Sequence, residues 1–335
     1  MRGACSKSVL IIAEGDDYHA LGVAKAIERC GGCPVIVDNS GFPQFIGLQH
    51  RQTVAGIESR ITLAEGRIIQ LDTLAGVWWR RPQCYKPAKT TLHPALRRFV
   101  MDESSEAFLG ALTASVPNFI NPVGASRQAS HKLAQLSRAV HYGLPIPETF
   151  VTNQPDAARD FAASRLGACV YKVFTGYDFR ACETRLLISE EDYNDLERVK
   201  DCPILLQEHI AGEYDVRVTI VGNEVFAASI HYKAGSHPVD GRVDRVPIYR
   251  HELPSDVRES IIGLVQSYGL FYGAADLRFS RERGYTFFEI NPEGQFLWVE
   301  IEAELGICDA MARLLMNKSE YPLARGVETP DSLPV

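Results

Sequence analysis

The sequence predicts an α/β protein of more than one lobe, and three observations support this fold class. An apolar strand over Val9–Ala13, a helix over Asp17–Cys30 and a second strand over Pro34–Asp38 give the chain a β-α-β start. Further along, helical and extended segments continue to alternate, and short turns join several neighbouring strands. The length of 335 residues suits two or three lobes better than a single one.

The composition is that of an ordinary globular protein, with 46% hydrophobic and 23% charged residues. No apolar run approaches the ~20 residues that a membrane-spanning helix needs. The short apolar stretch near the N-terminus is typical of a strand and not of a signal peptide, so we expect a cytoplasmic protein without a membrane partner. A net charge of −7 argues against a general nucleic-acid binder.

Two common kinds of site are not indicated. The eight cysteines are scattered along the chain, unlike those of a secreted disulfide scaffold. Cys30 and Cys33 form a CxxC pair, but no second pair follows at the spacing of a zinc site, so we expect thiols at a helix end. No GxGxxG motif follows the first strand, which argues against a dinucleotide site.

Later elements divide the chain into units. In the first unit, Ile61–Ala64 and Arg67–Leu71 form a hairpin around a Glu65-Gly66 turn. A second unit begins at Asn121-Pro122 with a helix from Ser126 to about Tyr142, whose apolar side is predicted to be Leu133, Leu136 and Val140. The strands Val170–Phe174 and Ile204–Glu208 follow it.

The third unit is rich in hairpins. Val216–Val221 and Glu224–Ile230 flank a two-residue turn, Gly222-Asn223, and Pro254–Tyr268 is an amphipathic helix. A last hairpin pairs Gly273–Phe279 with Tyr285–Asn291 before a C-terminal helix. We therefore expect an N-terminal domain over 1–120, a central lobe over 121–205, a C-terminal lobe over 206–320 and a polar tail over 321–335.

The last hairpin predicts a metal site. A turn centred between Glu282 and Arg283 places Asp276 opposite Glu289, and Asn291 lies on the same face two residues on. Two carboxylates and an amide oxygen are ligands suited to magnesium. The alternative is an exposed charged hairpin, but the neighbouring apolar residues Phe287, Phe288 and Ile290 indicate a well-buried strand.

Two lysines and two short motifs are further candidates for nucleotide contacts. Lys172 lies within an apolar strand and needs an anionic partner; a phosphate is favoured over a local carboxylate or solvent. For Lys132, near the start of its helix, a phosphate contact and a contact to a local carboxylate or solvent are equally well supported. Asp215 and Arg217 share one face of a strand. A strand end carries the four residues that could face an adenine edge, namely Gln207, Glu208, His209 and Ile210.

Taken in order, these elements resemble the ATP-grasp superfamily over residues 121–317. Within it, the chain resembles the microviridin-type, graspetide-forming peptide macrocyclases. Val77–Pro82 (VWWRRP) and Asn291–Glu300 (NPEGQFLWVE) carry this narrower resemblance. The sequence departs from the family pattern at Phe174–Asp178, which is not a glycine-rich phosphate loop, and at Asp240-Gly241-Arg242, where an Asp-Trp-Arg is expected.

The resemblance implies an ATP-grasp fold, in which an N-terminal pre-ATP-grasp β-α-β domain precedes two α+β lobes enclosing ATP. It implies ATP and Mg²⁺ as cofactors and a reaction in which a carboxylate becomes an acyl phosphate that a nucleophile then attacks. Arg217 would steady the acyl phosphate and Asp215 would reach the ribose. The residues implied to hold phosphate are Lys132, Lys172 and Arg242, the last with a catalytic role as well.

The implied partner is a ribosomally made precursor peptide with a leader and an acidic core. Its Asp or Glu side chains would be joined to Ser or Thr hydroxyls as esters, or to Lys amines as amides. The long connection His231–His251 is basic, and we expect Lys233, Arg245 and Arg250 to help bind this peptide, although a solvated charged loop explains the residues equally well.

Other functions stay open at this point. One is a ligase for free amino acids or a protein C-terminus, like glutathione synthetase or the ribosomal-protein glutamate ligases; another is a non-catalytic ATP-binding module. The Trp-Trp-Arg-Arg-Pro stretch weighs against the first and the intact ligand set against the second. The sequence does not determine the oligomeric state, and a homodimer is one option.

Overall fold

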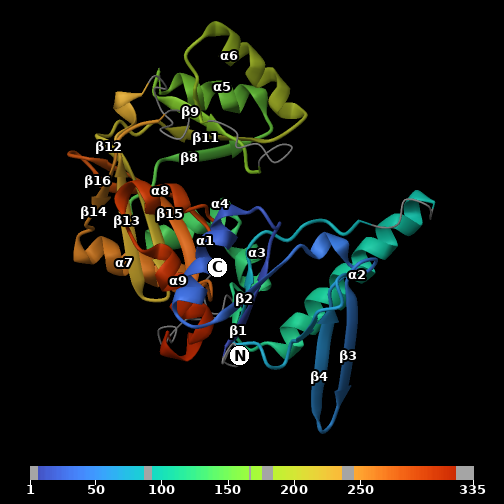
Figure 1. Cartoon of the computed structure of the whole chain (residues 1–335). Coiled ribbons are helices and arrows are strands. Elements are labelled where there is room, and N and C mark those ends of the chain that lie inside the picture. The colour runs from blue at the N-terminus through green and yellow to red at the C-terminus, as the bar shows by residue number, and fades with distance from the viewer. Residues whose placement is uncertain (1–6, 87–92, 166, 176–183, 236–244, 322–335) are drawn as a thin grey trace.

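The computed structural model describes residues 7–86, 93–165, 167–175, 184–235 and 245–321 (Figure 1). Figure 1 shows the lobe containing β8, β9 and β11 at the top, the lobe with β12–β16 below it, and a third region around β1 and β2. None of the described helices is long and apolar enough to cross a membrane.

The N-terminal region is built on a parallel sheet with strand order β2-β1-β6-β7. The predicted β-α-β start is confirmed, and Asp17 caps the helix by accepting a hydrogen bond from the backbone N–H of Ala20 at 2.7 Å. Cys30 carries a free thiol as expected, whereas Cys33 is disulfide-bonded. The elements are β1 Ser8–Ile12, α1 Tyr18–Arg29, β2 Cys33–Val37, β6 Gly76–Trp79 and β7 Phe119–Ile120.

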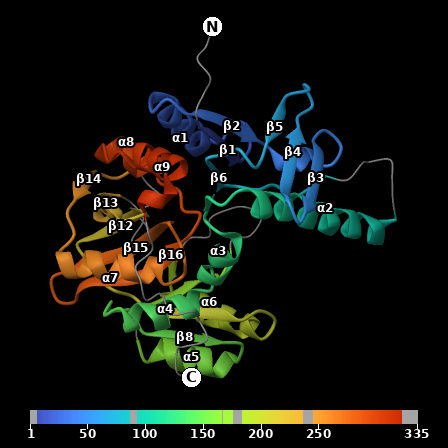
Figure 2. The ribbon, with the colours of Figure 1, turned by 90° about the horizontal axis from the view of Figure 1, so that it is seen from below.

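A smaller antiparallel sheet, β3-β4-β5, and the long helix α2 project from this region (Figure 2). The predicted hairpin corresponds to β4 and β5, but β4 begins at Gly56, earlier than expected. We did not predict β3, because its residues are polar on both faces and lack the alternation of a half-buried strand. The elements are η1 Asn39–Gly41, β3 Gly47–Thr53, β4 Gly56–Thr62, β5 Ile68–Gln70 and α2 Pro94–Ser115.

The single helix predicted from Ser126 to Tyr142 is instead two helices, α3 (Val123–Ala129) and α4 (Lys132–His141). Its predicted apolar face was also wrong in part: Leu136 is buried, but Leu133 and Val140 are 45% and 56% exposed. The break places Lys132 at the first position of α4, at the helix end nearest the C-terminal lobe sheet.

The central lobe holds an antiparallel sheet with strand order β10-β9-β11-β8 and its own small core around Ala158, Cys169 and Leu206. β11 runs over Ile204–Glu208 as predicted, so this sheet extends past the expected lobe boundary at residue 205. The elements are β8 Thr149–Thr152, α5 Pro155–Ala163, β9 Cys169–Lys172, β10 Arg185–Leu186, α6 Glu190–Asp195, η2 Leu196–Lys200 and β11.

The C-terminal lobe is an antiparallel sheet with strand order β14-β13-β12-β15-β16. Helix α7 covers one face through Ile261, Leu264 and Val265. The predicted hairpins are confirmed, while β14 and the short helix η3 occupy part of what was expected to be a long connection. The elements are β12 Tyr214–Val221, β13 Glu224–Ile230, η3 Tyr232–Ala234, β14 Ile248–His251, α7 Ser255–Gln266, β15 Tyr272–Ser280 and β16 Gly284–Asn291.

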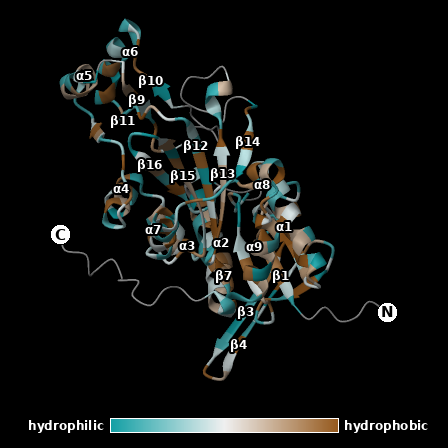
Figure 3. Ribbon diagram, turned by 90° about the vertical axis from the view of Figure 1, so that its left-hand side faces the viewer, coloured by the Kyte–Doolittle hydropathy of each residue, from teal (hydrophilic) through white to brown (hydrophobic). Residues whose placement is uncertain are grey.

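The last helices, α8 (Leu297–Ala303), α9 (Ile307–Met316) and η4 (Lys318–Glu320), return to the N-terminal region. Figure 3 shows α9 beside α1 and β1. One hydrophobic core cluster contains Val23 and Ile27 of α1 together with Met311 and Leu314 of α9. The N-terminal sheet and the C-terminal helices are therefore packed as a single unit.

Candidate functional site

The predicted pairing in the last hairpin is present, although it arises differently from the prediction. Ser280 pairs with Gly284, so the turn is centred on Glu282 and not between Glu282 and Arg283 as predicted. A β-bulge at Phe288 then shifts the register by one residue and places Asp276 opposite Glu289. Asn291 lies opposite Ala274, is exposed, and points its Oδ1 back to the N–H of Glu293 at 2.9 Å.

Each carboxylate of this pair has a cationic neighbour. Arg217 Nη1 lies 2.7 Å from Asp276 Oδ1, and Lys132 forms an ion pair with Glu289. The carboxylate side chains are 26% and 28% exposed, so both remain partly accessible to solvent. No group of three or more His, Cys, Asp or Glu in the described ranges is arranged for metal binding. The oxygen donors of Asp276, Glu289 and Asn291 nevertheless fit magnesium, which is held in phosphate sites by one or two carboxylates.

Arg217 is almost fully buried at this site, with 7% of its surface exposed. Burial acts to lower its pKa, but the bond to Asp276, together with the charges of Asp276, Tyr272 and Glu289, raises the pKa overall. Its other terminal nitrogen, Nη2, donates to the carbonyl of Gln295 at 2.9 Å. Arg217 is thus a fixed positive charge beside the proposed metal ligands.

Asp215 has a partner that the sequence analysis missed. Arg278 binds both of its carboxylate oxygens, with Nε–Oδ1 at 2.6 Å and Nη2–Oδ2 at 3.1 Å. Arg278 also donates to the carbonyl of Ile210 at 3.1 Å and lies 4.3 Å from the ring centroid of Tyr232. A usable signal was present: Arg278 lies two residues after Asp276 and so projects from the same face of β15.

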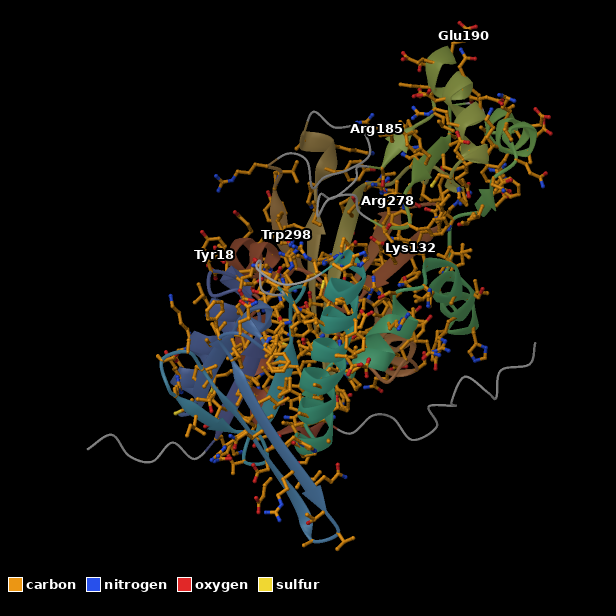
Figure 4. The ribbon with its side chains drawn as sticks, turned by 90° about the vertical axis from the view of Figure 1, so that its right-hand side faces the viewer. Tyr18, Lys132, Arg185, Glu190, Arg278 and Trp298 are labelled. Atoms are coloured by element: carbon orange, nitrogen blue, oxygen red, sulfur yellow. The ribbon has the colours of Figure 1, made fainter. Side chains whose placement is uncertain are left out.

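The central lobe reaches this face through Lys172. Its Nζ lies 4.6 Å from the ring centroid of Phe288, the bulged residue of β16. Figure 4 shows Arg278 between Arg185 of the central lobe and Lys132 of α4. The two predicted lysines therefore approach the same hairpin from different elements.

The predicted adenine-edge motif lies where the two lobes meet. Gln207 is buried and donates to Thr149 Oγ1 at 2.9 Å, while Oε1 of Gln207 is buried without a partner in the described part of the chain. Glu208 pairs with Arg283, with Nη1–Oε2 at 3.0 Å, and this bond lowers the pKa of Glu208. Burial, followed by the charge of Arg278, lowers the pKa of His209.

The three basic residues expected to bind substrate lie apart from the carboxylate pair. Arg245 is exposed and lies 3.5 Å from Glu302, while Arg250 donates to the carbonyl of Glu304 at the end of α8. Lys233, in η3, is exposed. Arg242 and the departure at residues 176–178 lie outside the described residues.

The chain is similar to known proteins in both sequence and structure. Residues 8–127 match the family of the MvdD pre-ATP grasp domain. No match was found among curated proteins.

Three solved structures are similar along nearly the whole chain. The macrocyclase MdnC of Microcystis aeruginosa, bound with its precursor peptide MdnA, is 27% identical, with a TM-score of 0.81 over 93% of this chain and 99% of that one. A RiPP-associated ATP-grasp ligase of Chryseobacterium gregarium, in complex with ADP and a leader and core peptide, is 25% identical, with a TM-score of 0.81 over 93% and 97% of the two chains. The macrocyclase MdnB of Microcystis aeruginosa is 26% identical, with a TM-score of 0.75 over 92% and 99%.

These similarities confirm the predicted fold class. The chain has the ATP-grasp fold, preceded by a pre-ATP-grasp domain. They also confirm the predicted resemblance to ATP-grasp peptide macrocyclases. The positions of the individual site residues stay predictions, supported by the contacts described above.

Proposed function

We propose that this chain is an ATP-grasp ligase that cross-links a ribosomally made precursor peptide. It would activate Asp or Glu side chains of the peptide as acyl phosphates and join them to Ser or Thr hydroxyls or to Lys amines. One observation carries the proposal: the chain is similar, over 93% of its length, to a macrocyclase bound with its precursor peptide. The arrangement of Asp276, Glu289 and Arg217 on one sheet face supports it chemically.

The nucleotide would lie between the central and C-terminal lobes. Magnesium, held by Asp276, Glu289 and Asn291, would neutralise the phosphate oxygens. Lys172 and Lys132 would contact the phosphates, and Lys132 would then exchange its bond to Glu289 for one to phosphate oxygen. Gln207, Glu208, His209 and Ile210 would border the adenine at the junction of the lobes.

In the first step, a carboxylate oxygen of the peptide attacks the γ-phosphorus of ATP, and the bond to the β-phosphate oxygen breaks to release ADP. In the second step, a hydroxyl or amine attacks the acyl carbon, phosphate leaves, and the proton passes to solvent. Arg217 is held rigidly by Asp276 and the Gln295 carbonyl, so it can stabilise the negative charge that develops in both steps without reorganising.

The ion pair of Asp215 modifies its assignment as the residue that contacts the ribose. Both of its oxygens are bound to Arg278, so its contact to a ribose would be made alongside that ion pair. Arg278 itself would then border the nucleotide, because it bridges Asp215 and the Ile210 carbonyl. We therefore add Arg278 to the proposed nucleotide-site residues.

The decisive experiment begins with a search beside this gene for a short gene that encodes a peptide rich in Thr or Ser and in Asp or Glu. The purified protein, the synthetic peptide, ATP and Mg²⁺ are incubated, and the products are followed by mass spectrometry. Each cross-link removes one water and should release one ADP and one phosphate. Brief alkaline treatment should open ester rings and leave amide rings intact.

The alternatives give different outcomes in the same assay. Addition of a free amino acid to a peptide raises the mass of the product, which would indicate a ligase for amino acids or protein C-termini. Binding of ADP without any ATP-dependent product across a panel of peptides and amino acids would indicate a non-catalytic module. The Asp276→Asn variant serves as the control for contaminating ligases.

A further inference from the structure

The segment Pro292–Phe296 directly follows the proposed metal ligand Asn291 and has no regular secondary structure. Its backbone is nevertheless held at successive positions by side chains from separate parts of the chain. Asn121 donates to the carbonyl of Pro292 at 3.0 Å, and Arg217 donates to that of Gln295 at 2.9 Å. The hydroxyl of Tyr272 donates to the carbonyl of Gly294.

The remaining contacts come from the N-terminal domain. Arg80, just after β6, donates from Nη1 to the carbonyl of Glu293 at 2.6 Å. His19, in the first turn of α1, accepts at Nε2 the hydrogen bond of the Phe296 N–H at 3.1 Å. Arg80 directly follows β6 and His19 lies in the helix that follows β1, and these two strands pair side by side in the parallel sheet.

Both residues are placed for this contact at an energetic cost. Arg80 is 1% exposed, and its Nε and Nη2 have no hydrogen-bond partner within the described residues. A buried guanidinium is unfavourable unless it is paired, and the pairing here consists of the Glu293 carbonyl and Asp17, 3.7 Å from Nε. His19 can accept the Phe296 N–H only while its Nε2 carries no proton.

The segment in turn orients two groups of the proposed site. The Glu293 N–H is bound by Asn291 Oδ1, so the position of Glu293 determines where that amide oxygen points. The Gln295 carbonyl holds Arg217 beside Asp276. There is no slack between these parts: a Cβ on Gly294 would lie 2.4 Å from the Cβ of Ala274 and 2.9 Å from Arg217 Nη2.

We infer that Arg80 and His19 are positioning residues through which the N-terminal domain sets the geometry of the metal site. This inference rests on the proposed function, since it concerns the same Asp276, Glu289 and Asn291 ligands. It gives Arg80, the first arginine of the Trp-Trp-Arg-Arg-Pro stretch, a role other than peptide contact. Loss of the hydrogen bond from Arg80 or of the one to His19 would let Pro292–Phe296 shift, and would weaken magnesium binding more than nucleotide binding.

The test measures ADP affinity by calorimetry in the full-length protein, with and without Mg²⁺. The variants are Arg80→Met, which keeps the side-chain volume without its donors, and the pair His19→Ala and His19→Gln. Glutamine presents an amide oxygen near the place of Nε2 and should restore the bond to Phe296. Arg29→Ala is the matched control, because Arg29 also joins the N-terminal domain to the C-terminal helices, through an exposed ion pair with Asp309.

We expect metal-free ADP affinity to stay unchanged in every variant. The gain in affinity on adding Mg²⁺ should fall by about 10- to 100-fold in Arg80→Met and His19→Ala, the range typical for loss of groups that orient metal ligands. His19→Gln and Arg29→Ala should keep the gain of the wild type. Thermal melting checks that each variant is folded, and the His19 pair decides the question alone if Arg80→Met does not fold.

Two results overturn the inference and are distinguishable from each other. If Arg80→Met and His19→Ala melt at lower temperature but keep the full effect of Mg²⁺, these residues only hold the domains together, and the proposed function stands. If ADP binding to the wild type does not respond to Mg²⁺, the metal site is wrong, and the proposed function fails together with the inference.

Discussion

Asp276 and Glu289 lie directly opposite each other because Phe288 is an extra residue in β16. In a regular ladder with the observed turn, Asp276 would face Phe288 and the carboxylates would be offset. The bulge also turns the Phe288 ring toward Lys172. A single irregularity therefore both pairs the proposed metal ligands and forms the contact to the central lobe.

The first prediction concerns this pair. Asp276→Asn and Glu289→Gln should each lower the rate of peptide ligation by more than about 100-fold. Each removes a charged ligand of the metal itself, and this loss should exceed the roughly 10- to 100-fold loss that is usual for residues that only orient such ligands. Ligation is measured by mass spectrometry with magnesium as the only divalent metal. Near-normal turnover in both variants would mean that these carboxylates do not hold the metal. Glu282→Gln, in the exposed turn of the same hairpin, is the control.

The second prediction concerns Lys172. Its replacement by Ala should weaken ATP binding about 10- to 100-fold, since a hydrogen bond to a charged group contributes about 1.5–3 kcal/mol. Lys172→Arg should also be impaired, because a planar guanidinium does not reproduce a compact ammonium over the Phe288 ring. Calorimetry with ATP is the measurement. Affinity equal to that of the wild type in Lys172→Ala would remove this residue from the phosphate site.

The third prediction concerns peptide binding by Lys233, Arg245 and Arg250. Replacing all three by Ala should raise the KM for the precursor peptide and leave ATP affinity unchanged, and added salt should weaken peptide binding to the wild type. Because Arg250 holds the Glu304 carbonyl at the end of α8, Lys233→Ala must be measured separately from Arg250→Ala. If the triple variant cyclises its precursor with an unchanged KM, these side chains are solvated surface charges.

The fourth prediction concerns acid stability. Burial, and next the charge of Arg80, lowers the pKa of His19 from 6.5 to about 4. Between these pH values His19 binds more protons in the unfolded chain than in the folded chain. The free energy of unfolding is therefore unaffected by His19 above pH 6.5 and decreases by about 3 kcal/mol as the pH falls toward 4. His19→Gln does not titrate, so its melting temperature should fall less over this range. Parallel melting profiles for wild type and variant would contradict this.

Local patterns in the sequence predicted much of the fold. The β-α-β start, the Gly222-Asn223 hairpin and the pairing of Asp276 with Glu289 depend on neighbours in the chain. The hairpin prediction was right in its pairing, but it centred the turn half a residue too late and included no bulge; the two errors cancelled. Periodicity also failed at α4, where contacts to other elements, and not the i, i+3, i+7 pattern, decide which face is buried.

The contacts that could not be predicted are those between residues far apart in the sequence. Arg80 and Glu293 lie 213 residues apart, and Arg278 and Asp215 lie 63 apart, so no spacing rule relates them. The sequence predicted the residues of the site as separate motifs, but the ion pairs between them depend on the order of the strands in the sheet. In that order β12 lies beside β15, although the two strands are not consecutive in sequence.

The shared packing of α1 and α9 has a mechanical consequence. The N-terminal sheet, the C-terminal helices and one face of the large sheet contribute to one core cluster, whereas the central lobe has a core of its own. Two bodies with separate cores can move against each other at much lower cost than two that share one. The carboxylate pair therefore belongs to a sheet that shares its packing with the N-terminal region, whereas Lys172 belongs to a lobe whose core is independent of it.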